Sequence, residues 1–160
     1  MMMTSQLGLI TEVHCQLDFS SLGILLSQPI VSDSRYDFIA DINGQLIKIQ
    51  CKTAYPEENN IISIVTSSKN WNSGVRHFYK NDIDYFYTYY KEQGYLIPIS
   101  IIGESQRNKR IRMGNKNQYH SNNTNATYGV DYMLETVLQR DFNYISEKVL
   151  VEDKKFHQRT

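Results

Sequence analysis

The stretch that decides the fold runs from Ser34 to Lys52 and reads SRYDFIADINGQLIKIQCK. Near its middle stands Asn43-Gly44, the strongest short-range signal for a β-hairpin, because both residues tolerate positive φ. The pattern predicts one strand over residues 35–43 and a second strand over residues 45–54.

This hairpin brings together polar side chains of three kinds. Residues two apart in a strand point to the same face, so Gln50 and Lys52 share one face and Cys51 points the other way. Pairing across the hairpin places Asp37 alongside them. A carboxylate, an amide oxygen and a lysine on one sheet face can hold a hard divalent cation and activate a water molecule.

The composition is that of one ordinary globular domain, which we expect to span residues 1–160. Hydrophobic residues make up 41% and charged residues 21% of the chain. No apolar run approaches the length of a transmembrane helix and no secretory leader is recognisable, so we expect a cytoplasmic protein with no membrane partner. The two cysteines, Cys15 and Cys51, indicate neither a disulfide framework nor a zinc site.

Formal charge sums to zero but is unevenly distributed along the chain. Residues 1–66 hold 3 basic and 7 acidic side chains, whereas residues 104–120 hold 5 basic side chains and one acidic side chain. A carboxylate-rich half beside a basic segment is typical of a protein that binds a metal ion and a polyanion together.

Apolar periodicity predicts a helix over residues 6–26. Leu7, Ile10, Val13 and Leu17 form its apolar stripe, and Thr11 and Cys15 lie off that stripe. The later elements are expected in this order: a loop at 55–60, a strand at 61–67, a short helix at 72–81, a hairpin at 82–90 and 95–102, and a helix at 129–141.

Residues 103–128 change in character and read as a polar insertion with a short strand near Arg110. Loops of this length in compact domains are usually functional or disordered. Arginine suits guanine and asparagine suits adenine in the major groove, so we expect this insertion to contact DNA. The candidate DNA-binding residues are Arg35, Lys69, Arg107, Lys109, Arg110, Arg112, Lys116 and Asn117.

A helix carrying Glu12, then the hairpin, then further strands and a closing helix, resembles the PD-(D/E)xK nuclease superfamily. Within it, the chain is most similar to the homing endonucleases of cyanobacterial group I introns. The resemblance implies an α/β fold with a restriction-endonuclease-like core, in which helices flank a central mixed β-sheet. Two positions depart from the motif: Tyr36 replaces its proline, and Gln50 replaces its (D/E) carboxylate.

The resemblance also implies roles. Glu12, Asp37, Gln50 and Lys52 would be the catalytic residues. Glu12, Asp37, Gln50 and the main-chain carbonyl of Cys51 would hold Mg²⁺ or Mn²⁺, and Lys52 would orient the attacking water. Because glutamine contributes an oxygen but no charge, its presence should weaken metal binding without abolishing it.

We therefore expect a metal-dependent homing endonuclease that hydrolyses phosphodiester bonds of double-stranded DNA at a long pseudo-palindromic target. One chain offers one active site and a duplex has two strands, so we expect a homo-oligomer, either a dimer or a tetramer. Two alternatives stay open. One is another nuclease of this fold, such as a restriction enzyme or a Holliday junction resolvase, and the other is a DNA-binding protein that has lost catalysis through Gln50.

Each residue also has a purely structural interpretation. Asp37 can be a polar residue at a strand end, Lys52 a solvated lysine, and Glu12 an exposed helix glutamate. The basic run can be a solvated surface. The combination of these residues, in this order on these elements, is what favours a nuclease site.

Overall fold

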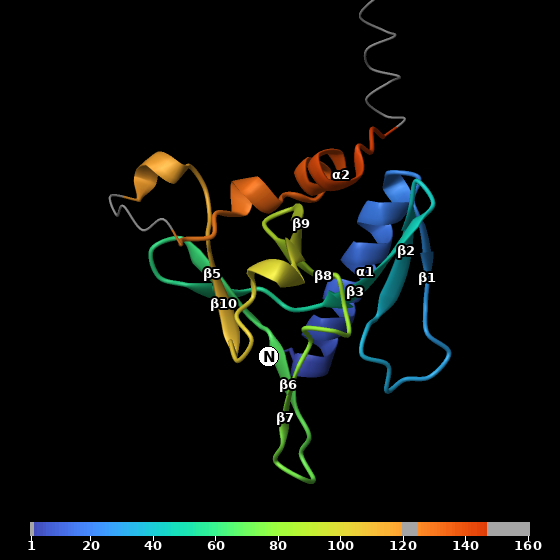
Figure 1. Ribbon diagram of the computed structural model, residues 1–160. Coiled ribbons are helices and arrows are strands. Elements are labelled where there is room, and N and C mark those ends of the chain that lie inside the picture. The colour runs from blue at the N-terminus through green and yellow to red at the C-terminus, as the bar shows by residue number, and fades with distance from the viewer. Residues whose placement is uncertain (1, 120–124, 147–160) are drawn as a thin grey trace, which may run out of the picture.

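The fold was analysed in a computed structural model, which describes residues 2–119 and 125–146 (Figure 1). The elements are α1 Thr4–Ser21, β1 Leu25–Ser27, β2 Phe38–Ile42, β3 Gln45–Cys51, β4 Tyr55–Glu57, β5 Ile61–Val65, β6 Ser67–Lys69, β7 Arg76–Phe78, β8 Tyr85–Tyr90, β9 Gln93–Pro98, η1 Ile99–Ile101, β10 Asn108–Arg112, η2 Lys116–Gln118, η3 Gly129–Tyr132 and α2 Leu134–Phe142.

A five-stranded mixed sheet forms the centre, in the order β1-β2-β3-β8-β9. Only the β3–β8 pair within it is parallel. A smaller sheet, β10-β5-β4, and the two-stranded hairpin β6–β7 complete the strands. The central sheet with its helices is the mixed α/β architecture that the sequence predicts.

The β2–β3 hairpin forms where the sequence predicts it. Asn43 and Gly44 both have positive φ, of 53° and 82°, as the two central residues of a type I′ turn require. The side chain of Asp41 accepts a hydrogen bond from the Gly44 N–H at 2.9 Å. The resulting register ends with Phe38 opposite Ile49, and Asp37, the residue before Phe38, contacts Gln50 through its side chain.

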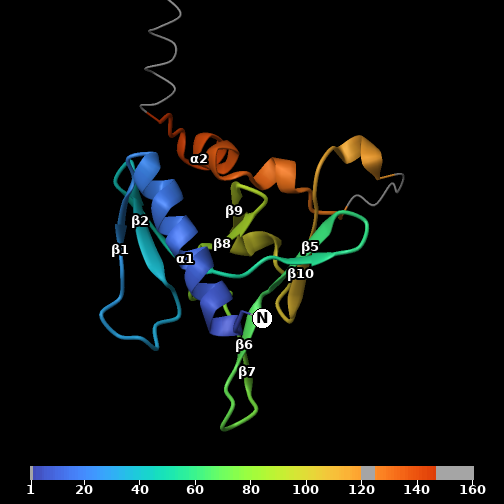
Figure 2. The ribbon, with the colours of Figure 1, turned by 180° about the vertical axis from the view of Figure 1, so that it is seen from behind.

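One face of the central sheet is buried along β2 and β3, and the other face is buried at β8 and β9. The buried residues of β2 and β3 alternate along each strand and pack with Cys15 and Phe19 of α1 and with Leu138 of α2. Phe86 and Ile97 belong to a second apolar cluster, which they share with the small sheet. Figure 2 shows α1 lying across the central sheet from behind. Gln50 and Lys52 point away from buried Cys51, on the side where the second cluster lies.

The first helix buries a different face from the predicted one. Its buried residues are Thr11, Cys15 and Phe19, four apart, whereas Val13 and Leu17 of the apolar stripe are 53% and 61% exposed. The helix also ends at Ser21, since Gly23 has a φ of 79°, and Leu25 and Leu26 belong to β1 instead. The face that meets the sheet thus carries the carboxylates Glu12 and Asp18 at its margins, both half-buried.

Other predictions have mixed outcomes. The strand near 61–67 and the hairpin near 82–102 are confirmed as β5 and β8–β9. The predicted helix over 72–81 is wrong, because this segment forms a turn and β7. The predicted loop over 55–60 contains β4, and the helix predicted over 129–141 begins as η3 before α2. The insertion over 103–128 contains β10, which pairs with β5; its residues 120–124 lie outside the described chain.

Gly94 of β9 offers a test of this packing. The phenol of Tyr87 donates a 2.6 Å hydrogen bond to Asp18 of α1, and a Cβ at position 94 would stand 2.8 Å from that phenol oxygen and against the carboxylate. We expect Gly94→Ala to lower the free energy of unfolding by about 1–3 kcal/mol, as overpacking does. Urea unfolding measures it.

Gly8→Ala is the matched control, because a Cβ there meets nothing within 4 Å inside α1. Alanine in a helix interior should raise stability by about 0.5–1 kcal/mol. An equal change in the free energy of unfolding for the two variants would contradict the close packing of α1 on β8 and β9.

Candidate active site

The candidate site lies at the open end of the β2–β3 hairpin. Asp37 directly precedes β2. Its N–H donates to the Ile49 carbonyl at 2.8 Å, which holds Asp37 against β3. Asp37, Gln50 and Lys52 are all half-buried. The prediction that Asp37 lies beside Gln50 is confirmed by direct contact between their side chains.

The Asp37 carboxylate and the Cys51 carbonyl each turn an oxygen atom toward the amide nitrogen of Gln50. Oδ2 of Asp37 accepts hydrogen bonds from Nε2 of Gln50 at 2.7 Å and from the N–H of Cys51 at 2.6 Å. The same Gln50 nitrogen lies 3.4 Å from the Cys51 carbonyl oxygen. The carboxylate and the carbonyl that the sequence proposes as metal ligands therefore both face the Gln50 amide.

Burial shapes the charge of the site. Desolvation raises the pKa of Asp37, against the opposing effects of the Cys51 N–H, the Lys52 ammonium and the Gln50 amide. Desolvation also raises the pKa of Glu12, and the nearby charge of Asp37 raises it further. Two neighbouring carboxylates whose ionisation is costly favour an added cation, because it would relieve both penalties.

Lys52 reaches the site from the strand end beyond Cys51. Its N–H donates to the Tyr87 carbonyl at 2.8 Å, which ties the end of β3 to β8. Its Nζ donates to the phenol oxygen of Tyr79 at 3.1 Å and lies 4.9 Å from the centre of that ring. The ammonium is thus held beside Asp37 by an aromatic residue that the sequence analysis did not single out.

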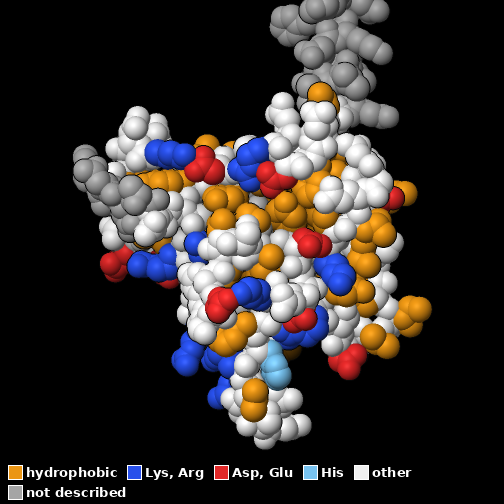
Figure 3. Space-filling view, in the orientation of Figure 1, with side chains coloured by type: hydrophobic (Ala, Val, Ile, Leu, Met, Phe, Trp, Pro, Cys, Tyr) orange, Lys and Arg blue, Asp and Glu red, His pale blue; other side chains and the backbone are white. Residues whose placement is uncertain are grey.

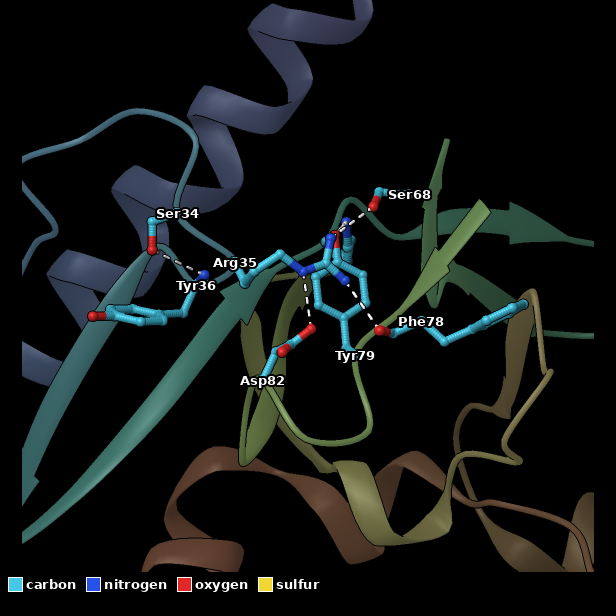
Figure 4. A network of polar contacts seen from close by, with 8 residues as sticks. Ser34, Arg35, Tyr36, Ser68, Phe78, Tyr79 and Asp82 are labelled. Carbon is cyan, nitrogen blue, oxygen red and sulfur yellow. Dashed lines mark hydrogen bonds and ion pairs between the residues drawn. The ribbon is translucent and has the colours of Figure 1, made fainter. Parts of the chain in front are cut away.

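Arg35 organises the wall next to Lys52. Its guanidinium donates to Asp82 at 2.9 Å, to Ser68 Oγ at 2.9 Å and to the Phe78 carbonyl at 3.1 Å (Figure 4). It also lies 4.2 Å from the centre of the Tyr79 ring. Sequence analysis missed Tyr79 and Asp82, because neither has a spacing relation to the hairpin.

Cys51 contributes backbone groups rather than a thiolate. Its side chain is buried against Cys15, and burial raises the pKa of the Cys51 thiol well above its ordinary value. A thiol held protonated is a poor nucleophile. Its N–H and carbonyl, however, both face Asp37 and Gln50.

The donor set fits a hard divalent cation better than a softer metal that prefers thiolate or imidazole ligands. Within residues 2–119 and 125–146, no group of three or more His, Cys, Asp and Glu side chains stands close enough to hold a metal. A cation at this site would depend on the Asp37 carboxylate, the Cys51 carbonyl and the Gln50 amide oxygen, with Glu12 nearby. Such oxygen donors suit Mg²⁺ or Mn²⁺.

The candidate DNA-binding residues lie in varied settings. Arg35 is engaged inside the protein as described above, and half-buried Lys109 donates to the Ile101 carbonyl, with its pKa lowered by desolvation. Arg110 pairs with Glu57 at 2.7 Å and Lys116 with Asp131 at 2.7 Å. The remaining four, Lys69, Arg107, Arg112 and Asn117, lie at or near the surface, with Arg112 against the rings of Tyr119 and Tyr128.

No helix of residues 2–119 and 125–146 has the length and apolar character needed to cross a membrane.

The chain is similar to several solved structures. A bacterial homing endonuclease, I-Ssp6803I, matches with a TM-score of 0.63 and 19% identity, over 88% of this chain and 94% of that one. The Archaeoglobus fulgidus Holliday junction resolvase Hjc matches with a TM-score of 0.41 and 9% identity, over 70% of this chain and 86% of that one. No curated protein sequence matches.

The first of these similarities confirms the predicted restriction-endonuclease-like fold. Residues 2–133 match the family described as PD-(D/E)XK endonuclease, and this span includes α1, the β2–β3 hairpin and every strand after it. The chain therefore belongs to the PD-(D/E)XK endonuclease family.

Proposed function

We propose that this chain is a homing endonuclease that hydrolyses phosphodiester bonds of double-stranded DNA at a long pseudo-palindromic target, with Mg²⁺ or Mn²⁺. The observation that carries the proposal is the convergence of Asp37 Oδ2 and the Cys51 carbonyl beside Lys52. The similarity to a bacterial homing endonuclease supports it.

The residues divide the work of hydrolysis. Asp37, Gln50, the Cys51 carbonyl and Glu12 would hold the cation, which when bound lowers the pKa of a water and offsets charge on the phosphoryl oxygens. Lys52, held by Tyr79, would orient the attacking water and stabilise the negative charge that develops on the phosphate. Gln50 would turn its amide so that the oxygen, rather than the nitrogen, faces the cation.

The face of β10 supports DNA as the substrate. Asn108, Arg110 and Arg112 alternate with Lys109 and Ile111, and Ile111 is fully buried, so the first three residues share the outer face of the small sheet. A strand that carries arginine and asparagine on one face is suited to reading base edges in the major groove.

A homo-oligomer, dimer or tetramer, would supply the second active site. The exposed residues of α1 include no charged side chain, and Leu9, Val13 and Leu17 form a stripe along it, with exposures of 59%, 53% and 61%. The stripe is symmetric about Val13. Two antiparallel copies of α1 could therefore place Leu9 of each chain against Leu17 of the other, as a two-fold interface requires.

Gln50 also favours a second candidate function, that of a DNA-binding protein without catalysis. Its amide donates a hydrogen bond to Asp37, so this carboxylate oxygen has a partner without a metal. This candidate predicts metal-independent DNA binding and no cleavage.

Cleavage of a randomised duplex library in Mg²⁺ separates the two functions. We expect the wild-type protein to cut a discrete near-palindromic site, and Asp37→Ala to abolish cutting. Lys52→Ala should reduce the rate about 100-fold or more, the scale of losing one charge-stabilising donor. Lys48→Ala is the matched control, because this exposed lysine lies on β3, the strand that leads to Lys52, and its loss should leave the rate unchanged.

Binding of the library by all four proteins with no cutting by any would overturn the nuclease proposal in favour of the second candidate. Neither binding nor cutting would overturn both.

Gln50→Glu tests the role of the amide. The substitution replaces the donor to Asp37 by a second carboxylate, so we expect the free energy of unfolding in EDTA to fall by about 1–3 kcal/mol. Mg²⁺ or Mn²⁺ should restore stability at a lower concentration than the wild-type protein needs. Thermal unfolding across a metal titration measures both effects.

Gln45→Glu, at the exposed start of the same strand, is the control for added charge and should change neither quantity. A Gln50→Glu protein as stable in EDTA as the wild type would contradict the contact between Gln50 and Asp37.

Val13→Lys tests the oligomer. A lysine at the centre of the apolar stripe would place two like charges at the two-fold axis, so the mass measured by light scattering should fall to that of a smaller assembly. Ile30→Lys, at a fully exposed apolar residue outside α1, should keep the wild-type mass. A wild-type protein that stays monomeric at high concentration would refute the proposal.

A further inference from the structure

The β6–β7 hairpin, residues 67–78, projects from the body of the molecule. Figures 1 and 2 show it extending beyond all neighbouring elements in opposite views. Its strands pair Ser67 with Phe78 and Lys69 with Arg76, and residues 70–75 form its tip. The sequence pattern does not predict this ribbon, since it predicts a short helix over residues 72–81.

The ribbon combines positive charge with exposed apolar side chains. Residues 67–78 contain Lys69 and Arg76 and no Asp or Glu. At the tip, Trp71 is 90% exposed and Val75 is 51% exposed. In Figure 3 the protrusion itself shows hydrophobic and histidine side chains and no acidic one, and Lys and Arg side chains lie beside its base.

The tip is ordered by its own hydrogen bonds. Oδ1 of Asn70 accepts from the N–H groups of Asn72 and Ser73 at 2.9 and 3.2 Å, and the Asn70 carbonyl accepts from Gly74 N–H at 2.8 Å. Gly74 supplies the positive φ, 69°, that closes the turn. Trp71 is thus presented on a shaped turn, which reduces the entropy lost when it binds a partner.

The base of the ribbon is fastened to the active site. Arg35, which stands two residues before Asp37 in the chain, donates hydrogen bonds to Ser68 on β6 and to the Phe78 carbonyl on β7 (Figure 4). The residue after β7 is Tyr79, whose phenol accepts the hydrogen bond from Lys52. A molecule bound by the ribbon would therefore lie in a fixed position relative to Asp37 and Lys52.

We infer that the β6–β7 ribbon is a second DNA-reading element, which enters the major groove beside the scissile phosphate and places Trp71 against the bases. The major groove admits a two-stranded β-ribbon, and the acid-free charge of this one suits the phosphates that flank the groove. This inference rests on the proposed function, because it requires duplex DNA as the substrate.

Geometry sets the reach of the ribbon. The five residues from Ser67 to Trp71 span at most roughly 17 Å at about 3.3 Å per residue. That length corresponds to about five base pairs at roughly 3.4 Å each. The bases read by the tip should therefore lie about five base pairs from the cut.

Trp71 is the only tryptophan of the chain, so its fluorescence reports on the ribbon directly. The full-length Lys52→Ala protein is titrated in Mg²⁺ with a dye-labelled duplex of the selected target. Anisotropy of the dye measures binding, and acrylamide quenching of the tryptophan measures exposure. We expect quenching to fall as the duplex binds. Binding with unchanged quenching overturns this inference and leaves the proposed function standing, while a wild-type protein that neither binds nor cuts duplex DNA overturns both.

Substitutions at the tip supply the second measurement. Trp71→Ala should weaken binding of the target about tenfold and relax the base preference about five base pairs from the cut. Trp71→Phe should retain most of the affinity, because it keeps an aromatic face. Ile30→Ala, the control, removes an equally exposed apolar side chain elsewhere and should bind as the wild type does. Unchanged affinity and base preference in Trp71→Ala would overturn the inference.

Discussion

The register of the β2–β3 hairpin is the constraint on which the rest of the site depends. The turn at Asn43-Gly44 sets that register, and the register brings the side chain of Asp37 to that of Gln50. Side chains alternate along a strand, so a slip of one residue would turn Gln50 and Lys52 toward the helices and Cys51 toward the site. The fully buried Phe38 and Ile49 oppose such a slip, because it would expose them. The Asn43-Gly44 turn and the Phe38–Ile49 pair thus fix the relative positions of Asp37, Gln50 and Lys52.

The glutamine at the (D/E) position of the motif has a physical consequence beyond the loss of a charge. With a carboxylate there, the site would hold two adjacent negative groups, and Glu12 would add a third. The amide instead donates to Asp37 and lies against the Cys51 carbonyl, where the two oxygen atoms converge. The site is therefore stable before any cation arrives, and a cation must compete with the amide for both oxygens. Weaker metal binding is the expected cost of that stability.

Local patterns in the sequence predicted those parts of the fold that local physics decides. The Asn-Gly turn, the apolar strand at β5 and the β8–β9 hairpin are confirmed, as is the contact of Asp37 with Gln50. The β6–β7 ribbon was missed because the contacts of Arg35 with residues 33 to 47 positions away hold its base, and no spacing reveals them. The buried face of α1 was mispredicted because its most apolar stripe faces outward.

The outward stripe of α1 and the tip of the β6–β7 ribbon both expose large apolar side chains. Burial of an apolar side chain of this size contributes about 1.5–3 kcal/mol, and within the described chain nothing covers Val13, Leu17 or Trp71. The two surfaces differ in their surroundings. The stripe lies among uncharged exposed residues of α1, which suits a second copy of the same helix, whereas Trp71 lies among basic residues, which suits a polyanion. On these proposals self-association and DNA contact fall on different elements, and Arg35 and Tyr79 join the ribbon to the active site.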